Sequence, residues 1–112
     1  MLDPFMNSLG FEAEIPEPGR ARVWADLKPE HLNNWGSAHG GFLYTLADSA
    51  FALASNSRGC LAVALSTHME YIKASRPGVR LEAEAREVHL GRSTGVYSVE
   101  VRADGALLAM FT

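Results

Sequence analysis

Residues 41–56 read GFLYTLADSAFALASN, and the architecture of the 112-residue chain follows from this segment. No glycine or proline interrupts residues 42–56, and the segment is rich in Leu and Ala, which favour helices. Its apolar residues recur at three- and four-residue spacing and also occupy the opposite side. The pattern therefore predicts one helix that is buried nearly all round, which ends at residues 56–59 with Gly59 as its C-cap.

Strand patterns lie on both sides of this helix. Before it come a short predicted helix over residues 3–9 and two predicted strands, the second of which spans residues 21–27 and follows a turn over residues 16–19. After it, strands are predicted over residues 61–72, 80–90, 93–103 and 106–112, with turns at Pro77-Gly78 and Asp104-Gly105. This order predicts an α+β fold in which an antiparallel sheet wraps around the helix.

Composition indicates one globular domain spanning residues 1–112. The chain is 47% hydrophobic, and its net charge of −3 comes with scattered basic residues, which argues against a nucleic-acid partner. The strand pattern is unbroken at Thr112, which leaves open whether the last strand continues beyond it.

The single cysteine and the N-terminal segment indicate the cellular compartment in which the protein resides. One cysteine, Cys60, excludes an intrachain disulfide and a cysteine-built zinc site, and we expect it to be a buried structural thiol. No secretory leader or apolar segment of about 20 residues is visible, so we expect no membrane partner. These features favour a cytoplasmic protein.

Asp48 is the one formally charged side chain between residues 31 and 57. A carboxylate on an apolar helix is costly unless it is paired or functional. Asp48 either faces solvent or caps a neighbouring element, or it performs chemistry, and the sequence leaves both interpretations open.

His39, Gly40 and Gly41 stand directly before the helix. Two glycines let the backbone approach a ligand, and the first amides of a helix have no internal partner. Such a terminus can stabilise a developing oxyanion. An ordinary glycine-rich helix entry with a structural histidine is the alternative.

The spacing between Gly40 and Asp48 has a consequence for assembly. Asp48 follows Gly40 by eight residues, which corresponds to roughly 12 Å along a helix. One small carbonyl group cannot contact both from the same helix. If both residues serve one reaction, they come from two subunits, and twofold symmetry predicts two equivalent sites in a homodimer.

A wider pattern resembles a known family. Asn33-x5-His39-Gly40-Gly41-x4-Leu46-Ala47-Asp48, with Ala-Phe-Ala at 50–52, is similar to the hotdog-fold acyl-CoA thioesterases, most of all to the phenylacetic acid degradation thioesterases of the PaaI type. The resemblance implies a hotdog fold and hydrolysis of an aryl- or arylacetyl-CoA thioester to free acid and CoA. It also implies no metal or other cofactor, and a homotetramer made of two dimers.

The resemblance also implies residue roles. Asp48 matches the catalytic carboxylate, acting as general base or nucleophile, and Gly40 matches the oxyanion-hole amide. Asn33 matches a loop side chain that places the thioester or the water, and His39 matches a histidine that orders this loop. Ser66, with Thr67 as its alternate, matches a hydroxyl that holds the water. The remaining substrate-binding candidates are Gly41, Tyr44, Lys73, Arg92, Ser93 and Thr94.

One departure and two alternatives accompany this assignment. Many relatives have Arg-Pro where this chain has Lys73-Ala74, which affects the expected phosphate contacts. A non-catalytic acyl-CoA binding module would need no carboxylate at position 48. A hotdog hydratase would have a histidine five residues after the aspartate, where this chain has Leu53.

Overall fold

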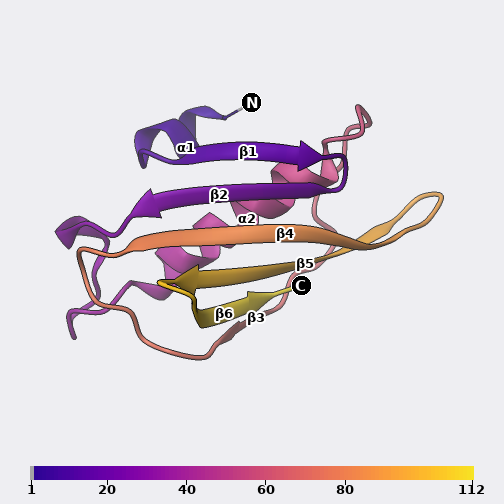
Figure 1. Cartoon of the computed structure of the whole chain (residues 1–112). Coiled ribbons are helices and arrows are strands. Elements are labelled where there is room, and N and C mark those ends of the chain that lie inside the picture. The colour runs from indigo at the N-terminus through magenta and orange to yellow at the C-terminus, as the bar shows by residue number, and fades with distance from the viewer. Residues whose placement is uncertain (1) are drawn as a thin grey trace.

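A six-stranded antiparallel sheet lies against one long helix in the computed structural model, which describes residues 2–112 (Figure 1). The strand order is β1-β2-β4-β5-β6-β3. The elements are α1 (Pro4–Ser8), β1 (Glu12–Glu17), β2 (Arg20–Asp26), the 3-10 helix η1 (Pro29–His31), α2 (Gly40–Ser55), β3 (Met69–Tyr71), β4 (Arg80–Leu90), β5 (Gly95–Ala103) and β6 (Ala106–Phe111). The predicted antiparallel sheet around a central helix is confirmed.

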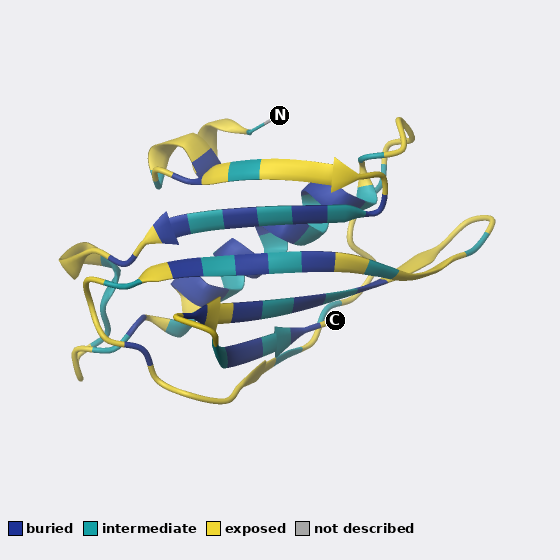
Figure 2. Ribbon diagram, in the orientation of Figure 1, coloured by how far each residue is buried: buried dark blue, intermediate teal, exposed yellow. Residues whose placement is uncertain are grey.

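The core forms where α2 crosses the middle of the sheet. Side chains alternate along β2, β4 and β5, as the buried and half-buried bands of Figure 2 show. Val23 pairs with Ala83, which in turn pairs with Val101, and all three are completely buried. Small residues in this row let α2 approach the sheet closely. Leu46 on α2 is also fully buried, so truncating it to Ala would cost about 2–5 kcal/mol.

The helix ends show how side chains set the boundaries. Asp3 caps α1, because its Oδ1 accepts a hydrogen bond from the Met6 amide at 2.8 Å. The C-cap of α2 is Asn56, whose Nδ2 donates to the Ala52 carbonyl at 2.9 Å. The prediction of Gly59 as C-cap was wrong, since Asn56 already satisfies the last turn. Gly59 takes a left-handed conformation, with φ of +83°, in the turn that follows.

The strand predicted over residues 61–72 was mostly wrong, since only Met69–Tyr71 forms β3. This strand pairs with β6, and one further backbone pair joins His68 to Thr112. Residues 61–67 have no neighbouring strand within 2–112, so their β-forming side chains cannot complete a ladder. Leu61, Val63 and Leu65 are consequently 92%, 86% and 86% exposed.

Two burial predictions also need correction. Helix α2 is not buried all round: its sheet-facing side is buried, whereas Gly41 is exposed and Thr45, Asp48 and Ala52 are half-buried. The sheet can cover only one side of a helix. Cys60 is exposed rather than buried, because it follows α2 in a turn outside the core.

Candidate active site

The loop before α2 is folded around the side chain of Asn33. Its Oδ1 accepts hydrogen bonds from the backbone amides of Trp35 at 2.9 Å and Ser37 at 3.1 Å. The Asn33 amide also donates to the Ser37 carbonyl at 2.8 Å. The side-chain Nδ2 has no hydrogen-bond partner within residues 2–112. Asn33 therefore shapes the loop with its oxygen and can present its amide nitrogen as a donor.

His39 is the N-cap of α2. Its Nδ1 accepts a hydrogen bond from the Gly41 amide at 2.9 Å, so the neutral ring carries its hydrogen on Nε2. The His39 backbone amide donates to the His31 carbonyl at 2.9 Å, and the His31 ring stacks on Phe42 at 4.1 Å between centroids. The start of α2 is thereby held from both the loop and the core.

The Gly40 amide is a free donor at the start of the helix. Unlike the Gly41 amide, it donates to no acceptor within the described residues. Its neighbourhood carries the positive end of the helix dipole, which favours an oxygen that gains negative charge. Chemically, this position can polarise a carbonyl group.

Tyr71, which sequence reasoning missed, contacts Gly40 from strand β3. Its hydroxyl donates to the Gly40 carbonyl at 3.2 Å, across 31 residues of sequence. No local pattern connects two residues so far apart, so only a contact prediction from related sequences could have found the pair.

Asp48 lies half-buried on the side of α2 that the sheet does not cover. Its carboxylate makes no hydrogen bond with residues 2–112. Burial, together with the negative charge of Asp3, raises the pKa of the Asp48 carboxyl above its ordinary value. A carboxylate with a raised pKa accepts a proton more readily, which suits a general base.

Tyr44 and Thr67 form a second polar contact. The Tyr44 hydroxyl and Thr67 Oγ1 are 2.5 Å apart, and the Tyr44 ring packs edge-on against Phe111 at 5.4 Å. Ser66 is exposed beside Thr67 and makes no side-chain hydrogen bond with the part of the chain that the structure describes. Of these two hydroxyls, Thr67 is the one that the fold fixes in place.

The remaining candidates lie at opposite ends of the molecule. Lys73 follows β3 closely, and its amide donates to the Leu108 carbonyl at 3.1 Å. Arg92, Ser93 and Thr94 are exposed in the turn between β4 and β5. Figure 1 shows this turn at the far end of the sheet from the start of α2. Within one chain, therefore, neither this turn nor Asp48 lies close to Gly40.

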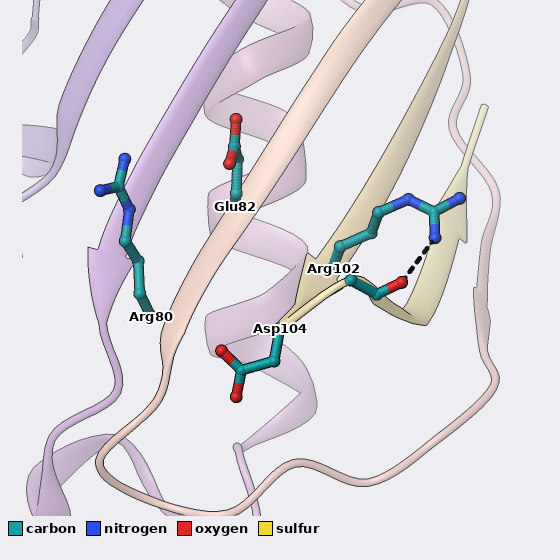
Figure 3. A pocket seen from close by; sticks show the side chains of 5 residues that line it. Arg80, Glu82, Arg102 and Asp104 are labelled. Carbon is teal, nitrogen blue, oxygen red and sulfur yellow. Dashed lines mark hydrogen bonds between the residues drawn. The ribbon is translucent and has the colours of Figure 1, made fainter.

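Two hollows on the surface lie elsewhere, on the charged outer sheet face. One is lined by Arg80, Glu82, Arg102, Asp104 and Gly105 (Figure 3), and the other by Glu82, Glu84, Glu100 and Arg102. Arg102 is already engaged by the Gly105 carbonyl at 3.2 Å and Glu100 at 2.6 Å. Neither hollow contains a predicted site residue. We place the candidate site by its chemistry, at Gly40 and Asp48.

Two further findings concern metals and membranes. Within residues 2–112, no group of three or more His, Cys, Asp and Glu side chains could hold a metal ion. None of the helices described here is long and apolar enough to cross a membrane.

Comparison with known proteins identifies the family. The model of the "Thioesterase superfamily" matches residues 36–109, a range that contains Gly40, Asp48 and Tyr71. The chain belongs to the thioesterase superfamily. The family predicted from the Asn33-to-Asp48 pattern is confirmed, and the predicted enzyme class, thioester hydrolase, is that of the family.

Two similar proteins carry the names of an esterase and a thioesterase. The acyl-coenzyme A thioesterase PaaI of Escherichia coli is 37% identical over 99 residues, which are 88% of this chain and 71% of that protein. A protein of Archaeoglobus fulgidus named "Putative esterase" is 50% identical over 84 residues, or 75% of this chain. The match spans about half of the latter protein, 54% of its length.

Solved structures of similar proteins confirm the hotdog fold. A mutant of the phenylacetic acid degradation protein PaaI from Thermus thermophilus superposes with a TM-score of 0.93 at 53% identity, covering 97% of this chain and 94% of that one. A hypothetical thioesterase from Streptococcus pneumoniae, solved with coenzyme A, gives a TM-score of 0.84 at 31% identity, covering 90% and 82%.

Proposed function

We propose that this thioesterase-superfamily chain hydrolyses acyl-CoA thioesters to a free acid and CoA, at sites shared between two subunits. The observation that carries the proposal is that one helix holds both the Gly40 amide and the Asp48 carboxylate, neither of which makes a hydrogen bond within residues 2–112. The name of the E. coli relative and the coenzyme A in the S. pneumoniae structure support an acyl-CoA substrate.

The thioester carbonyl binds at the Gly40 amide of one subunit. Its oxygen accepts a hydrogen bond from the Gly40 N–H. The helix dipole stabilises the negative charge that develops as the carbonyl carbon becomes tetrahedral. The free Nδ2 of Asn33 donates to the thioester or to the attacking water. His39 keeps the entry loop in place through its cap on Gly41.

Asp48 of the other subunit supplies the proton acceptor. As a general base it removes a proton from water, whose oxygen bonds to the carbonyl carbon to form the tetrahedral intermediate. The carbon–sulfur bond breaks when this intermediate collapses, the thiolate of CoA takes the proton held by Asp48, and the acid is released. As a nucleophile its carboxylate would instead attack the carbonyl carbon and displace the thiolate of CoA, which gives a mixed anhydride that water then hydrolyses. Ser66 or Thr67 holds the water in the first route.

The dimer is needed because the roughly 12 Å between Gly40 and Asp48 along α2 separates them within a chain. The exposed segment 61–67 and the edge strand β3 can pair with the same segment of a second copy. Small residues beside Asp48, namely Gly41, Thr45 and Ala52, leave room for the partner's helix. A tetramer of two such dimers follows from the family resemblance.

The remaining candidates contact the substrate at either end. In a twofold dimer the turn at Arg92, Ser93 and Thr94 of one subunit serves the site of the other, where it joins Lys73 to hold the CoA phosphates. Tyr44 and Gly41 line the acyl end. The name of the T. thermophilus relative supports an aryl- or arylacetyl-CoA, such as phenylacetyl-CoA, as the substrate. The proposed reaction uses no metal or other cofactor. We place the reaction in the cytoplasm.

Thiol release from a panel of aryl, arylacetyl and aliphatic acyl-CoAs tests this function. The wild type should hydrolyse at least one of them, Asp48→Asn should lose at least about 100-fold in kcat, and the control Asp26→Asn, at the exposed end of β2, should keep it. If the wild type binds acyl-CoA but releases no thiol, the chain is the non-catalytic binding module instead.

A mixing experiment tests the shared site. Gly40→Pro removes the amide donor at the first helical position, where proline is tolerated. Mixed Gly40→Pro and Asp48→Asn subunits should regain activity, because one of the two sites in a heterodimer is intact. Failure despite demonstrated subunit exchange would place both residues in the same subunit's site.

A further inference from the structure

The peptide group between Gly40 and Gly41 is held at both of its polar atoms. Its carbonyl oxygen accepts a hydrogen bond from the Tyr71 hydroxyl at 3.2 Å. Its N–H donates to Nδ1 of His39 at 2.9 Å. Two side chains from different parts of the chain, one on the edge strand β3 and one at the N-cap of α2, thus clamp a single peptide plane.

The two glycines provide the space for this clamp. A Cβ atom at Gly40 would lie 3.3 Å from Cε1 of Tyr71 and 3.5 Å from Cζ. A Cβ at Gly41 would lie 3.0 Å from Nδ1 of His39. Both glycines are in the helix, so neither is required by a left-handed backbone. Because they lack a side chain, the Tyr71 ring and the His39 ring can approach the helix backbone closely.

We propose that Tyr71 is a positioning residue for acyl-CoA hydrolysis, which holds the first turn of α2 so that the neighbouring Gly40 amide points at the thioester carbonyl. This role rests on the function proposed above. Glycine is the most flexible residue, so a helix that starts with two of them would fray without external contacts. The clamp removes that freedom and preorganises the donor.

The position of Tyr71 also links the carbonyl site to the dimer. Tyr71 pairs with Ala109 of β6 on one side, and its other side is the open edge of the sheet. The side chain is 55% exposed. A partner strand on this edge would restrict Tyr71 further, so that dimer formation and orientation of the Gly40 amide are coupled.

Tyr71→Phe tests the role, because it keeps the ring against Gly40 and removes only the hydroxyl. The matched control is Tyr97→Phe, which loses a tyrosine hydrogen bond to Glu87 of 2.9 Å, away from the start of α2. We expect kcat of Tyr71→Phe to fall about tenfold, with KM changed less than twofold. Amide exchange measured by NMR should be faster at Gly41, whose N–H is held by His39, in this variant only.

A second comparison separates positioning from general stability. Gly40→Ala places a methyl group against the Tyr71 ring, so its loss of kcat should be largely absent in a Tyr71→Ala background, which already lacks the clamp. Fully additive losses, or a Tyr71→Phe variant with wild-type kcat and exchange, would overturn the role of Tyr71 alone. If the wild type itself hydrolyses no acyl-CoA, the proposed function fails and the positioning role falls with it.

Discussion

Arg58 and Glu87 form a two-pronged ion pair that fastens the end of α2 to strand β4. The Arg58 Nε and Nη2 atoms each donate to a Glu87 carboxylate oxygen at 3.0 Å. The Tyr97 hydroxyl donates a hydrogen bond to the same carboxylate at 2.9 Å. Nearby, Ser57 Oγ accepts a hydrogen bond from the Gly19 amide at 2.7 Å. The C-terminal end of α2 is therefore held by polar contacts, as its N-terminal end is held by His39 and Tyr71.

Glu87→Gln is expected to lower the Tm and to flatten its pH dependence. Hydrogen bonds from Arg58 and then Tyr97 hold the pKa of the Glu87 carboxyl below its ordinary value. A lowered folded-state pKa stabilises the protein above the ordinary pKa of glutamate, and this gain is lost as the pH falls through the lowered value. Thermal unfolding between pH 7 and 3 measures the effect. Glu30→Gln is the control, and an equal change there would refute the assignment.

Asp48→Asn is expected to change the pH dependence of stability in the opposite direction to Glu87→Gln. It should also abolish activity. The raised pKa means that ionised Asp48, which is disfavoured by burial and then by Asp3, opposes folding. The contribution of Asp48 to wild-type stability should therefore fall as the pH rises above about 4, the ordinary range of aspartate. The variant should lack this fall and be at least as stable as the wild type at pH 7. Unfolding at several pH values and a fixed subunit concentration checks it; a less stable Asp48→Asn would contradict it.

The pH dependence of wild-type kcat should report the ionisation of the same group, Asp48. If Asp48 acts in its ionised form, kcat rises with pH on the acid side, with a midpoint above the ordinary pKa of aspartate, because burial and then the Asp3 charge raise its pKa. Asp3→Asn should move that midpoint to lower pH. A pH–rate profile of both proteins measures this, and a midpoint that stays in place would show that Asp3 does not act on the catalytic carboxylate.

His39→Ala is expected to destabilise the protein by about 1 kcal/mol, because it removes the N-cap of α2. It should also lower kcat, since the Gly40–Gly41 peptide loses one of its two anchors. His39→Asn, which offers another good capping side chain, should restore the stability and most of the activity. Chemical denaturation and steady-state kinetics provide the two readouts. Restored stability without restored activity would mean that the imidazole contacts substrate itself.

Val63→Lys is expected to produce monomers and to abolish activity. Val63 is 86% exposed in the segment that we propose pairs with a second copy, and a charge there opposes burial. Ile15→Lys, on the opposite edge strand β1 and 36% exposed, serves as the control. Analytical ultracentrifugation and thiol release measure assembly and activity. An active monomer of Val63→Lys would exclude the shared site.

Local sequence patterns predicted most elements because they depend on short-range physics. The alternation of Leu81, Glu82 and Ala83 places residues 80–90 in one strand with a buried face, and β4 has these bounds. Residues 61–68 have equally strong strand propensity, yet they can form a strand only if a neighbouring strand pairs with them. Propensity is a property of the segment, whereas pairing is a property of the whole assembly.

The candidate site divides in the same way. Local patterns predicted the helix, most of the flanking strands, the place of Gly40 at the helix start and the eight-residue separation of Asp48 from it, since helical rise depends on residue number alone. The packed fold was needed to show that Tyr71 holds the Gly40 peptide and that burial with Asp3 raises the pKa of Asp48, because these contacts join residues distant in the chain. The cap of His39 on the Gly41 amide spans only two residues, but the side-chain orientation that makes it, and leaves the Gly40 amide without an acceptor within residues 2–112, is not written in a local pattern.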